Sequence, residues 1–163
     1  MGNTLLISDK ENVVRLLSKM WVSQDTILHI AFTLRENETY ISVNRPGVDS
    51  YAKDVKSFVE AHPDFSIDEN SGFLGAVLNV GDIRASEITV EGIKLDVNVE
   101  VEPREKFTKS HAGIFTRQKG KNVKTGETLY IKSVEKGVSS DEVLLEVRNR
   151  LLDLARLEKS KLE

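Results

Sequence analysis

The chain has 163 residues, of which 39% are hydrophobic and 30% charged, and it carries a formal net charge of −3. This length and balance are typical of one globular domain, which buries roughly two-thirds of its unfolded surface without needing a metal or a disulfide. The absence of cysteine excludes disulfides, thiolate catalysis and cysteine-ligated metal clusters, and it fits a reducing compartment.

The N-terminal stretch lacks the pattern of an export or membrane signal. Its longest apolar run is Leu5–Ile7, far shorter than the apolar core of a signal peptide. No run in the sequence approaches the ~20 apolar residues that span a bilayer. We therefore expect a cytoplasmic protein without a membrane partner, in which residues 1–12 form a loose arm and residues 13–163 form a single domain.

The first part of the domain is predicted to contain a hairpin and then a helix. Residues 13–22 are apolar enough to be buried, but their periodicity leaves helix and strand open. Residues 26–34 are rich in β-forming residues and residues 39–44 alternate, so the pair, joined by a short polar loop, predicts a β-hairpin. A helix is expected over residues 50–61, because its apolar residues recur at spacings of three and four and Pro63 ends it.

The middle of the chain carries the strongest β patterns. Residues 72–80 form a nearly continuous apolar run, which is typical of a strand buried on both faces, and residues 81–82 mark a turn or a bulge. Residues 88–102 contain a tight turn at residues 91–92, followed by a strict alternation. Because a strand has a period of two, one face of this strand is predicted to be apolar, with Leu95, Val97, Val99 and Val101.

The last third is predicted to add two short strands and a long helix. The strands are expected at residues 112–116 and 128–134, on either side of a polar loop. The helix is expected at about residues 140–158, with charged last turns that fray. These elements favour a single α+β domain, with a curved, antiparallel-rich sheet of about five to seven strands packed with a central helix at about 50–61 and a long C-terminal helix.

The charge of the chain is unevenly distributed. Residues 104–124 contain seven basic residues and one acid, a balance of +6, so the remainder must carry −9 to give the net charge of −3. A basic segment in an acidic protein predicts an anionic or protein partner. The basic residues are Arg104, Lys106, Lys109, Arg117, Lys119, Lys121 and Lys124.

The stretch after β-forming residues 112–116 has the composition of a phosphate-binding loop and also that of an ordinary exposed turn. Phe107 and Phe115 flank it, which makes only a partial stacking platform for bases, so nucleic acid is weakly supported as the partner. Arg45 is a second candidate for anion binding, because it leaves a strand immediately before a Pro-Gly turn. The alternative for Arg45 is a surface arginine without a ligand.

His111 is the candidate catalytic residue. It follows Ser110, but neighbouring residues of a strand point to opposite faces, so the two are not expected to form a nucleophile–base pair. His111 could instead act as a general acid or base on a phosphorylated or nucleotide-type substrate, with Arg45 or Arg104 holding the anion. The alternative is a structural or solvent-facing histidine.

No metal site or cofactor is predicted. The histidines at 29, 62 and 111 lack the close spacing of a ligand pair. Asp96, Glu100 and Glu102 share one face of a strand, which is read as its solvent-facing side. The sequence contains no phosphate-binding loop, dinucleotide fingerprint or hydrolase elbow. The leading hypothesis is therefore a non-enzymatic binding or accessory domain whose partner docks at residues 104–124, and the alternative is a metal-independent enzyme that uses His111.

Overall fold

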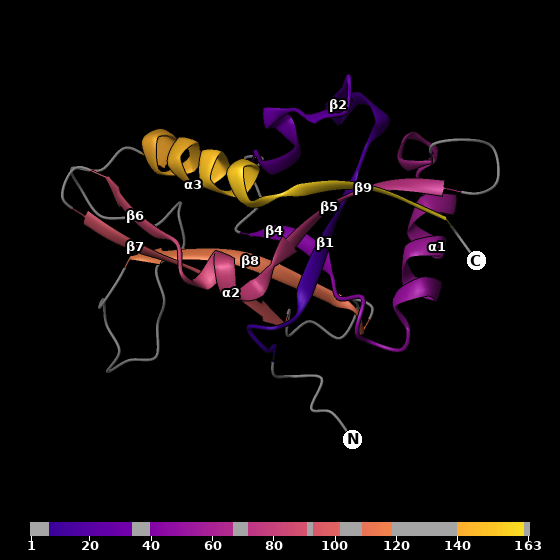
Figure 1. Ribbon diagram of the computed structural model, residues 1–163, viewed down its shortest axis with the longest axis horizontal. Coiled ribbons are helices and arrows are strands. Elements are labelled where there is room, and N and C mark those ends of the chain that lie inside the picture. The colour runs from indigo at the N-terminus through magenta and orange to yellow at the C-terminus, as the bar shows by residue number, and fades with distance from the viewer. Residues whose placement is uncertain are drawn as a thin grey trace.

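A computed structural model describes residues 7–33, 40–66, 72–90, 93–101, 109–118 and 140–161. In these residues a curled, seven-stranded antiparallel sheet combines with three helices (Figure 1). The strands are ordered across the sheet as β6 (Glu87–Val90), β7 (Ile93–Val101), β8 (His111–Gln118), β4 (Ile41–Asn44), β1 (Asn12–Leu17), β5 (Gly72–Asn79) and β9 (Arg156–Lys161). A separate ribbon pairs β2 (Val22–Ser23) with β3 (Thr26–Ile27). The helices are α1 (Tyr51–Ala61), α2 (Val80–Arg84) and α3 (Ser140–Leu154).

The sheet carries a hydrophobic core on each face, because consecutive strand residues point to opposite sides. From β1, Leu17 joins the larger core, which is covered by α2, α3 and the 3-10 turn at His29–Phe32. The neighbouring Leu16 joins the smaller core, where Val55 and Val59 of α1 pack against β1 and β5. Each fully buried aliphatic side chain contributes roughly 1.5–3 kcal/mol to the free energy of folding. These two cores therefore fix which face of the sheet each helix covers.

The strongest sequence patterns are confirmed. β5 is buried at every residue from Gly72 to Leu78, because it lies between β1 and β9 and has a core on each face. β6 and β7 pair as the hairpin predicted around residues 91–92. β8 contains the strand predicted at 112–116, and α1 falls within the predicted range 50–61. Among the described residues, none of the helices has the length and apolar character needed to cross a membrane.

The hairpin predicted between residues 26–34 and 39–44 is wrong. Within the described residues 26–33 only Thr26–Ile27 forms a strand, and it pairs with β2, while β4 pairs with β8 and β1. A 3-10 turn follows β3, which buries Ala31 and Phe32 against the larger core. Local β preference is overridden here, because burying these two side chains requires a bend rather than a straight strand.

The C-terminal helix is shorter than predicted. It ends at Leu154 rather than near residue 158, and the residues expected to fray form β9, which pairs with β5. Leu157 packs against the larger core from this strand. The turn or bulge predicted at residues 81–82 is likewise wrong, because these residues lie inside the short helix α2.

The division into an arm at residues 1–12 and a domain at residues 13–163 stays a prediction. Within the described part of that arm, Ile7 is buried in the larger core and β1 already begins at Asn12. The strand predicted at 128–134 lies outside the described residues.

Candidate functional site

Several of the predicted site residues meet at one end of the sheet, where β4 ends and β8 begins. Asn44 is opposite His111 in the antiparallel register of these strands. The next residue, Arg45, donates its backbone N–H to the carbonyl oxygen of Ser110 at 2.8 Å. We call this region, with the N-terminal turn of α1 packed beside it, the β4–β8 junction.

Arg45 is bound internally at this junction. Its side chain is 5% exposed, and its guanidinium donates two hydrogen bonds of 3.0 Å to the two carboxylate oxygens of Glu11. Burial alone would raise the pKa of Glu11, but the hydrogen bonds from Arg45 and from the backbone N–H of Ser8, with the charges of Arg45 and Arg84, lower it overall. The geometry is the two-pronged arginine–carboxylate pair that fixes both side chains, so the charge of Arg45 is matched within the chain.

Ser110 is held by the helix beside the junction. Its backbone N–H and its Oγ donate to Oδ2 of Asp54 at 3.1 and 2.7 Å, and its Oγ accepts a bond of 2.9 Å from Asn44. Asp54, in the first turn of α1, also accepts a hydrogen bond of 2.8 Å from the hydroxyl of Ser50, the residue before the helix. Because Ser110 is fully buried, its hydroxyl has no access to a substrate and serves to tie β8 to α1.

His111 lies on a different side of the chain from Ser110. Its ring is half-buried and packs edge-on against Tyr40, with 5.9 Å between the ring centroids. Ser110 meanwhile points to Asp54, so this structure offers no serine–histidine pair at the junction. Neither of the two surface depressions described below includes His111 among its lining residues. A catalytic role for His111 stays a prediction.

Two of the seven basic residues of the segment lie in the described part of the chain, toward opposite ends of β8. Lys109 is exposed two residues before the strand begins, whereas Arg117 is near its far end. Six residues of extended chain separate His111 from Arg117, a distance of about 20 Å. The backbone of Arg117 therefore lies at the other end of β8 from His111 and from Arg45 beside it. The other four lysines and one arginine of the segment lie outside the described residues, namely Arg104, Lys106, Lys119, Lys121 and Lys124.

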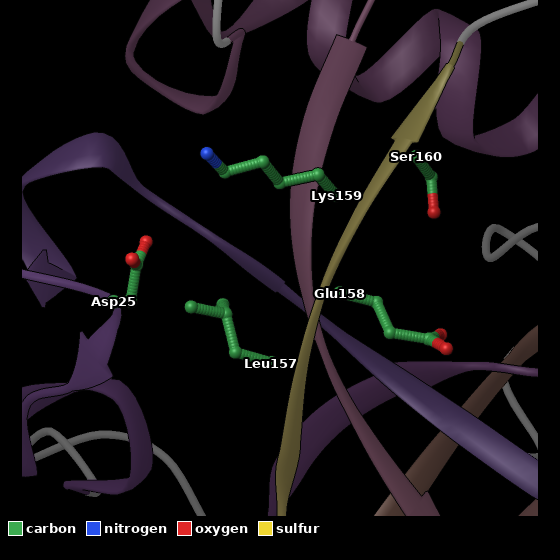
Figure 2. Close-up of a pocket in the computed structure, with 5 residues that line it drawn as sticks. All are labelled: Asp25, Leu157, Glu158, Lys159 and Ser160. Carbon is green, nitrogen blue, oxygen red and sulfur yellow. The ribbon is translucent and has the colours of Figure 1, made fainter.

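A second candidate region is an open groove that the sequence did not suggest. It lies between β9 and the turn of the β2–β3 ribbon, where a depression of about 580 Å³ is lined by Asp25 and by the β9 residues Leu157 to Ser160 (Figure 2). An adjoining depression of about 350 Å³ shares Asp25 and Leu157 and continues past Ile27 to Leu152 and Ala155 at the end of α3. We call the two together the β9 groove. The sequence gives no strand signal for β9, because residues 156–161 contain a single apolar residue, Leu157, and have the composition of the charged tail of a helix.

Metal binding has no support in the described part of the chain, where no three histidine or carboxylate side chains cluster. At the junction the polar side chains form hydrogen bonds that hold the fold together. The β9 groove has an apolar floor and a charged rim. Comparison of this chain with family models, with curated proteins and with solved structures finds no match.

Proposed function

We propose that the chain is a non-enzymatic binding domain that holds an anionic partner through the basic residues of segment 104–124. The observation that carries this proposal is the anchoring of Ser110, whose N–H, carbonyl oxygen and Oγ all bond within the junction. Lys109, the preceding residue, is exposed on that fixed backbone. A side chain presented from an ordered backbone loses less conformational freedom when it binds.

The charge distribution supports the same proposal. Segment 104–124 is the basic part of an acidic chain, so it attracts anions while the rest of the surface repels them. The separation of about 20 Å along β8 also limits the kind of partner. A small ion contacts only one end of the strand, whereas an extended polyanion or the acidic surface of a protein reaches both Lys109 and Arg117.

The enzymatic alternative remains a weaker proposal. It requires His111 as acid or base and an arginine that clamps the anion, but Arg45 is bound to Glu11 and nearly buried. Arg104 would have to supply the clamp alone. Binding needs no such assembly of groups, which is why we favour it.

The test measures binding of a single-stranded oligothymidylate, used as a simple polyanion, by fluorescence anisotropy over a range of salt concentrations. Replacing Lys119, Lys121 and Lys124 together by alanine should reduce the slope of log K against log salt by about 2, at roughly 0.7 for each cation lost. Lys109→Ala alone should reduce the slope by about 0.7.

A matched control removes three exposed lysines elsewhere, with Lys10, Lys19 and Lys53 all changed to alanine. This control changes the net charge by the same amount as the first triple variant, and it should retain most of the slope of log K against log salt. Equal effects of the two triple variants, or no salt-dependent binding by the unmodified chain, would contradict the proposal.

A further inference from the structure

The β9 strand is at the edge of the sheet. It pairs with β5 from Arg156, opposite Val77, to Lys161, opposite Gly72. Within the described residues no strand pairs with its other side. Alternate residues of an edge strand direct their N–H and C=O groups outward, where they can bond to an additional strand.

The β9 groove runs beside this edge and would receive the side chains of an added strand. Figure 2 shows Leu157 and Lys159 extending from β9 toward the side where Asp25 lies, while Glu158 and Ser160 extend the other way. Leu152 and Ala155 are half-buried and continue the apolar floor. One face of an added strand would thus meet a partly apolar surface beside the cation of Lys159.

The wall of the groove opposite β9 is the tight turn of the β2–β3 ribbon. Gln24 and Asp25 have φ angles of 51° and 62°, a conformation that favours glycine. Ser23 pairs with Thr26 across this two-residue turn, which fixes the position of Asp25. Beyond the ribbon the surface stays apolar, because Leu28 and Ile30 are 36% and 54% exposed.

We propose that the outer edge of β9 binds an extended acidic segment of a partner protein, which adds to the sheet as a further strand. The basic character of β9 favours this occupant. Arg156 is paired with Glu158 at 3.9 Å, which leaves Lys159 and Lys161 as the excess cations of the strand, against the one acid of the opposite wall, Asp25. Backbone hydrogen bonds supply affinity in this mode of recognition and side-chain pockets supply specificity. The fitting segment alternates carboxylates, placed near Lys159, with apolar side chains that lie over Leu157.

A second copy of the chain fits this edge less well. Two β9 strands side by side would bring together two segments that are each positively charged, and like charges opposite one another destabilise strand pairs. Lysines on edge strands commonly prevent such self-pairing. The same lysines attract an acidic strand.

The proposed edge is independent of the basic segment at β8. Three strands, β4, β1 and β5, lie between β8 and β9 in the sheet, and adjacent strands are about 4.8 Å apart. Failure of peptide binding at β9 therefore leaves the binding proposed for segment 104–124 unaffected, and the converse also holds.

The test uses a synthetic peptide of six residues, the length of β9, in which glutamate and valine alternate. Its binding to the full chain is measured by isothermal titration calorimetry, and hydrogen–deuterium exchange is followed in residues 156–161. Binding that slows exchange in this strand is the expected result. A peptide of the same sequence with N-methyl groups on every amide should fail to bind, because neither of its edges has the donors for strand addition.

A charge reversal separates the proposed edge from general attraction. Lys159→Glu should weaken binding of the acidic peptide about fivefold, the effect of replacing one exposed attraction by a repulsion, and should improve binding of a lysine–valine peptide. Lys94→Glu, an equal change at an exposed position of β7, should do neither. Equal effects of the two variants, binding of the N-methylated peptide, or light scattering that shows a dimer dissociated by Lys159→Glu would each overturn the proposal.

Discussion

The β4–β8 junction and the β9 groove differ in how their polar groups are satisfied. At the junction, Arg45 and Ser110 are buried and bonded to Glu11 and Asp54 within the chain. Along β9, Lys159 is exposed and the outer backbone edge has no strand partner among the described residues. Arg45 and Ser110 thus hold the fold together. The charged strand β9, for which the sequence predicted no site, borders the more accessible surface.

The largest expected effect tests whether the junction is structural. Glu11→Ala leaves the guanidinium of Arg45 buried without its carboxylate, which should lower the free energy of unfolding by about 3 kcal/mol, the low end for a buried pair because Glu11 is partly exposed. Urea denaturation measures this loss. Glu60→Ala is the control, because its ion pair with Lys56 is 4.0 Å long and exposed, and it should cost less than about 0.5 kcal/mol.

The same pair has a defined dependence on pH. Since the pKa of Glu11 is lowered in the folded chain, its stabilisation is complete above the ordinary glutamate pKa and is lost as the pH falls through the folded value. Glu11→Ala should therefore lose less stability than the unmodified chain on acidification. If Glu11→Ala and Glu60→Ala have equal effects, the junction is no more essential to the fold than the surface.

An intermediate effect is expected where Ser110 joins α1. Asp54→Ala leaves the buried N–H and hydroxyl of Ser110 without their acceptor, at a cost of about 2 kcal/mol, whereas Ser110→Ala should cost about 1 kcal/mol. Because both changes break the same bonds, the double variant should lose less than the sum. Urea denaturation of the four proteins gives this coupling. Strictly additive losses would show that the two side chains act separately.

The smallest effect concerns the face of β9 that is turned away from the groove. Burial, and then the negative charge of Glu158, raise the pKa of Tyr51 to about 12. A raised tyrosine pKa stabilises the fold below the unfolded value near 10 and loses that contribution as the pH rises toward 12. Tyr51 remains partly exposed, so solvent screening keeps the contribution below about 1 kcal/mol.

Ultraviolet titration of tyrosinate checks this prediction. Glu158→Gln should lower the pKa of Tyr51 modestly, because burial remains the larger cause, and Tyr51→Phe should remove the corresponding transition. Ser160→Ala, a neutral change on the same face of β9 (Figure 2), serves as the control. An unchanged titration in Glu158→Gln would mean that Glu158 and Tyr51 do not interact across β9.

The parts of the fold that were predictable are those in which local pattern and tertiary packing agree. The apolar run of β5 is long enough to specify a strand with a core on both faces, and the alternation of β7 specifies its buried side. At residues 29–32 the local pattern and the tertiary packing disagree. Ala31 and Phe32 become buried through contacts with α3, which is more than a hundred residues away in the sequence and leaves no mark on the local pattern.

The candidate sites show the same division. The sequence singled out Arg45 as an anion-binding candidate and considered Ser110 only as the neighbour of His111, whereas the groups that bind them in the structure, Glu11 and Asp54, are far away along the chain. No spacing rule joins such pairs. The β9 groove was missed because Leu157 continues a helical stripe in the sequence, whereas pairing with β5 determines its conformation.

The position of β9 has a consequence for how the protein is made. β9 is synthesised after every other described strand, yet it covers one side of β5, the most apolar strand of the sheet. Until residues 156–161 have left the ribosome, β5 is itself an edge strand, and apolar edges are sites of aggregation. As the last of the described strands to be added, β9 thus replaces an apolar, aggregation-prone edge of the sheet with a charged edge.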